Sequence, residues 1–164
     1  MATDGVQRAC ANCTAGKFST YGKQKCTDCK RGRYANLKAT ECMLCPAGYY
    51  GKDTIDVKQR ISVISACDPC KKGRYSSASG IDSKDLCNAC SPGKYSKEKS
   101  NDKEGDCKDC DAGKYTKEGG QEECAGCKSS ETSESGATVC TKCDAGLFMS
   151  SPSSPSTSNI KVCR

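Results

Sequence analysis

The large apolar residues of this chain recur at one position of a repeated unit and are otherwise widely spaced. The unit reads Cys-x-x-Cys-x-x-Gly-x-aromatic and is followed by a polar loop of variable length. Seven of the eight units carry both the glycine and the aromatic residue: Gly16 and Phe18, Gly32 and Tyr34, Gly48 and Tyr50, Gly73 and Tyr75, Gly93 and Tyr95, Gly113 and Tyr115, and Gly146 and Phe148. One large residue per short unit predicts small β-hairpins and little or no helix.

The fixed positions of the unit each suggest a structural role. We expect the glycine to adopt a positive φ in a tight turn after the cysteine. The aromatic residue must pack against something that every unit contains, either the disulfide or the backbone of the next unit. The unit after Cys127 lacks both residues and is expected to be the loosest joint.

Five of the residues between the glycine and the aromatic residue are cationic: Lys17, Arg33, Arg74, Lys94 and Lys114. Their stems either lie over neighbouring tyrosine rings with the charged groups in water, or form a cationic stripe for an acidic glycan.

One loop, residues 53–66, is longer and more apolar than the others. In it Ile55, Val57, Ile61 and Val63 alternate with polar residues, which predicts a β-strand. A ring of about twenty residues has little against which to bury this apolar face. We therefore expect these four residues to form an intermolecular contact. The alternative is a hairpin that folds back and packs on its own repeat unit.

The low content of large apolar residues is typical of a disordered chain, whereas the high content of cysteine is typical of a disulfide-rich one. Leu, Ile, Val and Phe make up 16 of the 164 residues and Trp is absent, too little for an ordinary core. The 17 cysteines reverse this interpretation. We divide the chain into a lead, residues 1–9, and eight tandem repeats within residues 10–163, at about 10–25, 26–41, 42–66, 67–86, 87–106, 107–123, 124–139 and 140–163.

Zinc is the main alternative to disulfides, since Cys-x2-Cys-x12-Cys-x2-Cys from Cys10 to Cys29 is close to zinc-finger spacing. Three features favour disulfides. There is no histidine, the number of cysteines is odd, and the glycine does not alternate between two kinds of unit. We therefore expect neither a metal nor a cofactor.

The sequence alone does not determine the disulfide connectivity. The repeat favours joining the second cysteine of each pair to the first of the next, because this uses Cys163 and leaves only Cys10 unpaired or intermolecular. An interlocked alternative would join Cys10 to Cys26 and Cys13 to Cys29. The favoured pairs are Cys13–Cys26, Cys29–Cys42, Cys45–Cys67, Cys70–Cys87, Cys90–Cys107, Cys110–Cys124, Cys127–Cys140 and Cys143–Cys163.

The unit resembles the ephrin-receptor-like cysteine-rich repeat and the single-disulfide module of tumour necrosis factor receptors. In those modules Cys-x-x-Gly-x-aromatic leads to a ring-closing cysteine, as in Cys90-Ser91-Pro92-Gly93-Lys94-Tyr95 followed by Cys107. It is also similar to CxxC-rich surface proteins of protists. The resemblance implies an elongated tandem array of single-disulfide modules in an extracellular setting, and it transfers no ligand.

Two segments are candidates for glycosylation. Asn12 begins an Asn-Cys-Thr acceptor sequence. The Ser/Pro-rich loop is either a flexible linker or an O-glycosylated stretch, with Ser151, Ser153, Ser154, Ser156 and Thr157 as acceptors.

We expect a non-enzymatic protein, because no histidine serves acid–base chemistry and a pattern repeated eight times is typical of architecture. Disulfides place the chain outside the cell or on its surface. The first expectation is a structural subunit or segment of a filament, surface hair or coat. It would assemble with itself or other extracellular proteins, with glycans as possible partners, no nucleic acid and no transmembrane segment. The second is a ligand-binding ectodomain module of a receptor or surface antigen.

Overall fold

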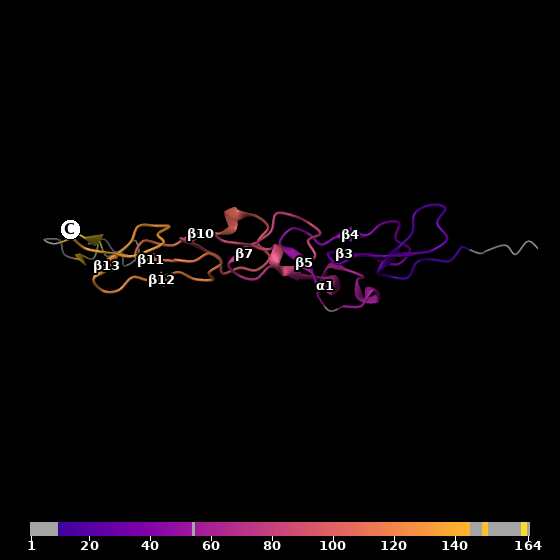
Figure 1. Cartoon of the computed structure of the whole chain (residues 1–164), viewed down its shortest axis with the longest axis horizontal. Helices are drawn as coiled ribbons and strands as arrows, with labels where there is room; N and C mark the ends of the chain where they lie inside the picture. Colours follow the sequence, from indigo (N-terminus) through magenta and orange to yellow (C-terminus); the bar gives the residue numbers. More distant parts are fainter. Residues whose placement is uncertain (1–9, 54, 145–148, 151–161, 164) are drawn as a thin grey trace, which may run out of the picture.

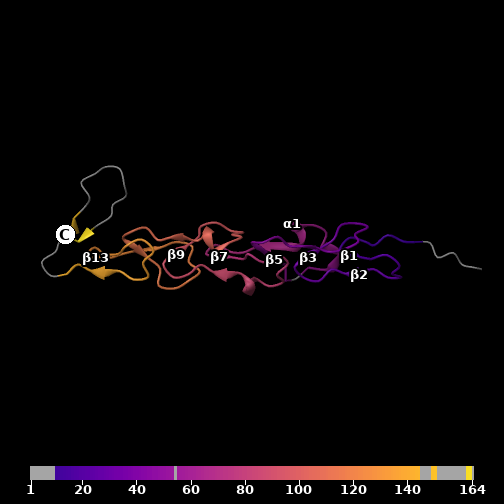
Figure 2. The same cartoon turned by 90° about the horizontal axis from the view of Figure 1, so that it is seen from above.

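The protein is a narrow rod in which small disulfide-closed rings follow one another in sequence order (Figures 1 and 2). The computed structural model describes residues 10–53, 55–144, 149–150 and 162–163, the last four by their backbone alone. Two perpendicular views are both elongated, so the array does not fold back on itself. Within the described residues, no helix has the length and apolar character needed to cross a bilayer.

Seven described disulfides close the rings, which we number in chain order. They are ring 1, Cys13–Cys26; ring 2, Cys29–Cys42; ring 3, Cys45–Cys67; ring 4, Cys70–Cys87; ring 5, Cys90–Cys107; ring 6, Cys110–Cys124; and ring 7, Cys127–Cys140. The small, disulfide-rich tandem array expected from the repeat is confirmed.

Regular structure consists almost entirely of two-stranded antiparallel hairpins. Seven of the eight described hairpins pair the strand that holds the aromatic position with the strand inside the next Cys-x-x-Cys. The pairs are β1 (Lys17–Phe18) with β2 (Thr27–Asp28), β3 (Arg33–Tyr34) with β4 (Met43–Leu44), β5 (Tyr49–Gly51) with β6 (Cys67–Pro69), β7 (Arg74–Tyr75) with β8 (Asn88–Ala89), β9 (Lys94–Tyr95) with β10 (Lys108–Asp109), β11 (Lys114–Tyr115) with β12 (Ala125–Gly126), β13 (Glu131–Thr132) with β14 (Thr141–Lys142), and β15 (Met149–Ser150) with β16 (Val162–Cys163).

The turn before each aromatic position explains the glycine. In ring 5 the Lys94 N–H donates to the carbonyl of Ser91 at 3.0 Å, which closes a turn with Pro92 and Gly93 at its centre. Gly93 has a φ of +80°, the value that a type II turn requires at its third residue. The positive φ expected from the sequence is confirmed at the six described glycines of the repeat, and Gly146 lies outside the described residues.

Successive rings are joined by a recurring set of backbone hydrogen bonds. Between rings 4 and 5, the Gly73 N–H donates to the Ser96 carbonyl at 2.9 Å and the Ser76 N–H to the Asn101 carbonyl at 3.0 Å. In the opposite direction, the Ser100 N–H donates to the Cys70 carbonyl at 3.0 Å. The same three bonds recur between rings 5 and 6 and between rings 6 and 7. These hydrogen bonds join the rings in a chain that has too few large apolar residues to form an ordinary hydrophobic core.

Contacts also reach beyond the neighbouring ring. A Cβ atom added to the repeat glycine of one ring would overlap a backbone carbonyl two rings along the chain. The pairs are Gly16 with Val57, Gly32 with Gly80, Gly48 with Ser100, Gly73 with Gly120, and Gly93 with Gly136. Contacts are therefore not confined to immediately neighbouring rings.

Small side chains follow the aromatic position because they are buried where two rings meet. Ala35, Ser76, Ser96 and Thr116 are all less than 5 % exposed, whereas the preceding tyrosines are only half-buried. The sequence analysis did not single out this position. Its signal was the run of Ser, Ala, Gly and Thr directly after the aromatic residues in rings 1 to 6.

Ring 7 is joined to ring 6 in the same way despite its atypical sequence. Its hairpin β13–β14 is formed, the Gly113 N–H donates to the Ser133 carbonyl at 2.9 Å, and the Gly136 N–H donates to the Cys110 carbonyl at 2.8 Å. The Ser133 hydroxyl adds a bond to the Lys114 carbonyl at 2.8 Å. A loose joint is therefore not found between rings 6 and 7.

The apolar loop of ring 3 is not the strand that its alternation predicted. It contains a 3-10 turn, η1 (Val57–Gln59), and a short helix, α1 (Val63–Ala66). Asp56 and Ser62 cap these turns, because each accepts a bond from a backbone N–H two or three residues later. Two further 3-10 turns are η2 (Lys84–Leu86) and η3 (Glu104–Asp106).

Candidate functional site

The cysteines serve the architecture of the rod. The two cysteines of one Cys-x-x-Cys belong to different disulfides, which removes the zinc alternative for the described pairs. Cys10 is free and exposed, as the ladder pattern requires. Cys143 is disulfide-bonded, and the side chain of its expected partner Cys163 lies outside the described residues.

Several predicted residues cannot be placed. Gly146, Phe148, Ser151, Ser153, Ser154, Ser156 and Thr157 lie outside the described residues. Asn12 is exposed and directly precedes the bridged Cys13.

The predicted interface residues of ring 3 do not lie together on one open face. Ile55 and Val63 pack against the buried cluster of Cys45, Ala66 and Cys67. The premise that these two side chains have no partner in their own chain was wrong. Val57 is half-buried, and Ile61 is 45 % exposed.

An exposed apolar side chain lies close to Ile61 in the sequence and was not singled out. Ile64 is 87 % exposed, and its backbone carbonyl accepts a bond from the Lys52 ammonium at 2.9 Å. This bond fixes the backbone at Ile64 while its side chain faces solvent.

The same loop also completes a ring junction. In the other described junctions the Cys carbonyl of one ring accepts from a backbone N–H of the next. Between rings 2 and 3 the Cys29 carbonyl instead accepts from the Arg60 guanidinium at 2.6 Å. The Arg60 carbonyl accepts from the Ala35 N–H at 2.9 Å. Arg60 therefore supplies both the donor and the acceptor that a normal loop provides from its backbone.

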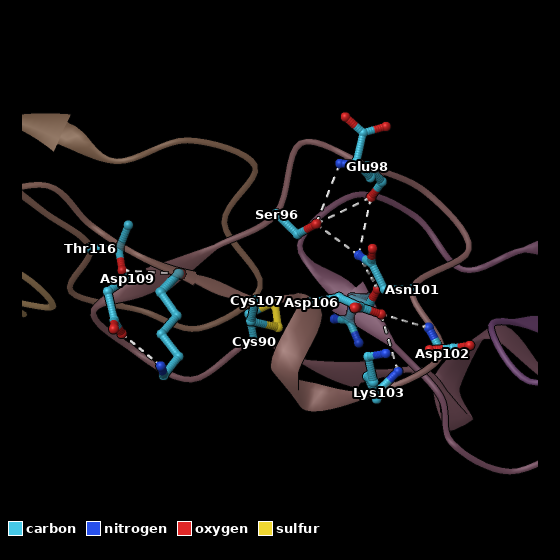
Figure 3. The surroundings of a disulfide bond; sticks show 12 residues. Cys90, Ser96, Glu98, Asn101, Asp102, Lys103, Asp106, Cys107, Asp109 and Thr116 are labelled. Atoms are coloured by element: carbon cyan, nitrogen blue, oxygen red, sulfur yellow. Dashed lines mark hydrogen bonds and ion pairs between the residues drawn. A yellow bond between two sulfur atoms is a disulfide. The ribbon is translucent and has the colours of Figure 1, made fainter.

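Asn101 holds ring 5 through its buried side chain (Figure 3). Its Nδ2 donates to the Ser96 hydroxyl at 2.8 Å and to the carbonyls of Arg74 and Glu98, both at 3.2 Å. Asn101 is 6 % exposed. A buried amide with these partners fixes the loop that meets ring 4.

Three of the five members of the cationic stripe form an ion pair, two of them with an acid of their own hairpin. Lys17 pairs with Asp28 at 2.8 Å, and Lys94 pairs at 2.6 Å with Asp109, which is labelled in Figure 3. Both acids lie directly opposite their lysines in the strand register. Lys114 reaches Asp111 at 3.5 Å instead. The stripe as a whole is therefore not an open row of positive charges.

Arg74 is an exception, because Ala89 occupies the opposite position in its hairpin. Its guanidinium donates to the carbonyl of Cys87 at 2.9 Å. Beside it, where ring 3 meets ring 4, lies a cavity of about 190 Å³ lined by Tyr50, Lys71, Arg74, Lys84, Asp85 and Cys87.

Tyr50 lines this cavity as a neutral hydrogen-bonding group. Partial burial raises the pKa of its phenol above 10.0, and the nearby carboxylates of Asp68 and Asp53 raise it further. The hydroxyl therefore remains protonated at neutral pH.

A corresponding cavity lies where ring 5 meets ring 6. It measures about 70 Å³ and is lined by Tyr95, Lys97, Asp111, Lys114, Glu123 and Cys124. Tyr95, Asp111, Lys114 and Cys124 stand at the repeat positions of Tyr50, Lys71, Arg74 and Cys87. Its two lysines are matched by two carboxylates, with Lys97 at 3.4 Å from Glu123.

Comparison with models of known protein families and with curated proteins gave no match. The geometry itself shows a tandem array of cysteine-rich repeats. Its seven described disulfides are typical of a secreted or extracellular domain.

Proposed function

We propose that this chain is a non-enzymatic structural protein of the extracellular space, forming a segment of a filament, a surface hair or a coat. The observation that carries the proposal is the continuous interlocking of the rings. Each repeat glycine in rings 1 to 5 lies against backbone two rings further along. Such overlapping contacts resist bending more than a chain of single joints, and stiffness is what a rod-like structural element requires.

The bonding of the rod also suits exposure outside the cell. Its buried positions are mostly cysteines in disulfides and small residues after the aromatic position. Disulfides persist in oxidising compartments and stabilise a chain that lacks a conventional core.

Electron microscopy of the native material tests the proposal. We expect the chain within filaments or an ordered coat, and dispersed single molecules would contradict it. Solution scattering tests the rod itself, since a compact domain of this length has a radius of gyration of about 15 Å and the rod should give roughly twice that or more.

A second candidate is a ligand-binding ectodomain module of a receptor or surface antigen. It is favoured by the exposed side chains of Ile61 and Ile64, because two exposed apolar groups three residues apart on one loop suit contact with a protein. Native molecules that remain single and capture one soluble partner would favour this candidate over the filament.

We further propose glycosylation at Asn12 and in the Ser/Pro-rich loop. The exposure of Asn12 supports the first site. Mass spectrometry of native peptides, before and after enzymatic deglycosylation, tests both.

A further inference from the structure

The cavity between rings 3 and 4 differs from its counterpart between rings 5 and 6 in charge. Among the side chains that line it, Lys71, Arg74 and Lys84 face a single carboxylate, that of Asp85, which leaves a net charge of +2 at neutral pH. Asp68 and Asp53, which lie near Tyr50, are already paired with Lys52 and Arg31. The counterpart has two lysines and two carboxylates and is neutral. A hollow with unbalanced charge concentrates the local field and attracts a counter-ion.

The substitutions that create this charge occur at equivalent positions of the repeat. Lys71 stands where ring 6 has Asp111, directly after the first cysteine of the ring. Ala89 stands where ring 5 is followed by Asp109, the acid that neutralises Lys94. The junction of rings 3 and 4 therefore lacks the counterparts of both acids that neutralise Lys94 and Lys114.

The cationic groups remain available to a ligand. Among the described residues, none of Lys71, Arg74 and Lys84 forms an ion pair with a carboxylate. Arg74 uses a guanidinium N–H for the Cys87 carbonyl and has further donors, since a guanidinium carries five. Asp85 accepts a bond from the Ser83 hydroxyl at 3.3 Å, so the one acid of the cavity is already engaged.

We propose that this cavity, lined by Tyr50, Lys71, Arg74, Lys84, Asp85 and Cys87, binds the anionic group of an acidic glycan, a sulfate or a carboxylate. The guanidinium of arginine and the ammonium group of lysine donate hydrogen bonds to such oxyanions, and these charge-assisted bonds are stronger than neutral ones. The Tyr50 hydroxyl adds a neutral donor, and its ring presents an apolar surface to a sugar. A cavity of about 190 Å³ has room for one charged group of a glycan chain.

This inference deepens the proposed extracellular role, since it rests on that role for contact with glycans. It can fail separately, because binding is measured on the isolated full chain and assembly by electron microscopy. A chain that binds no glycan could still assemble, and a chain that does not assemble could still bind a glycan.

The test uses immobilised dextran sulfate and polygalacturonate as probes, with neutral dextran as the blank. We expect the chain to bind at least one acidic probe at low salt and to be released as the salt concentration rises. Binding to dextran sulfate alone identifies a sulfate, and binding to both probes identifies any oxyanion. Absence of binding to both, or tighter binding to phosphatidylserine vesicles or duplex DNA, would overturn the proposal.

Paired variants separate the cavity from the overall charge of the chain. The double variant Lys71→Gln with Arg74→Gln should weaken binding at least about tenfold. The double variant Lys97→Gln with Lys114→Gln removes the same charge from the neutral cavity and should change binding by less than about twofold. Equal losses in the two variants would mean that the net charge of +6 attracts the probe without a site.

A milder variant guards against misfolding. Lys84 is exposed, so its replacement by Gln should leave the hairpin and the disulfides unchanged. Binding should weaken about threefold in Lys84→Gln. Unaltered binding in Lys84→Gln and in a correctly bridged double variant would refute the site.

Discussion

The α-carbon of Gly93 lies against the carbonyl of Gly136, two rings further along the rod. No side chain fits between them, and Gly93 also has a φ of +80°. The glycine is therefore required twice, by its turn and by a distant ring. This relationship makes the stability of one ring depend on the ring after next.

Gly93→Ala should destabilise rings 5 to 7 by roughly 2–5 kcal/mol, because a left-handed alanine and an overpacked contact both cost energy. Hydrogen exchange measures this at the Gly136 N–H, which donates to the Cys110 carbonyl. Gly22→Ala is the control, since Gly22 also has a positive φ but has open space around it. If Gly136 is equally protected in both variants, the contact two rings away carries no energy.

Asn101→Ala should destabilise ring 5 by about 1–3 kcal/mol, because the buried Ser96 hydroxyl loses its amide partner. Gln121 occupies the equivalent position in ring 6 but is exposed. Gln121→Ala should change the free energy of unfolding by less than about 0.5 kcal/mol. Thermal unfolding under non-reducing conditions compares the two, and similar losses would contradict the role of burial.

Arg60→Ala should loosen the junction of rings 2 and 3 by about 1.5–3 kcal/mol, since the Cys29 carbonyl loses a charged donor. Arg33→Ala removes an equal charge from an exposed side chain and should have little effect. The rate at which a mild reductant opens the Cys29–Cys42 disulfide reports on this junction. An unchanged rate in Arg60→Ala would show that the loop holds without the guanidinium.

Ionisation of Tyr50 should make the fold less stable at alkaline pH. Its pKa is raised in the folded state, mainly by burial and then by Asp68 and Asp53. The unfolded phenol therefore ionises first, so this contribution is fully present below pH 10 and is lost as the pH rises through the folded pKa. Ultraviolet titration should show one tyrosine that ionises late, and Tyr50→Phe should remove that step. A curve unchanged by Tyr50→Phe would contradict the assignment.

Ile61→Lys combined with Ile64→Lys should abolish assembly while the disulfides and the monomer fold remain, if ring 3 joins chains through these exposed side chains. Val139→Lys is the control, because Val139 is exposed on ring 7 at 55 %. Light scattering before and after mild dissociation of native material measures the effect. Normal assembly in the ring 3 variant would direct attention to Cys10 instead.

The sequence repeat predicted most of the architecture, because each ring is formed by residues that are close together in the chain. The cysteine spacing indicated the ladder of rings, and the residues around Gly93 indicated a tight turn, since a short turn admits few backbone conformations. Alternation failed at residues 55–63, because the caps at Asp56 and Ser62 satisfy the backbone locally and favour helical turns.

Only the tertiary structure decided what lies between rings. The approach of Gly93 to Gly136 and the hydrogen bond from Arg60 to the Cys29 carbonyl join segments that no spacing relates. The charge of the Arg74 cavity likewise depends on which strand lies opposite and on which loop closes the hollow. Sequence periodicity determines conformation within one ring, where neighbours along the chain are neighbours in space. Contacts between rings depend on how consecutive hairpins are oriented, which only the folded backbone specifies.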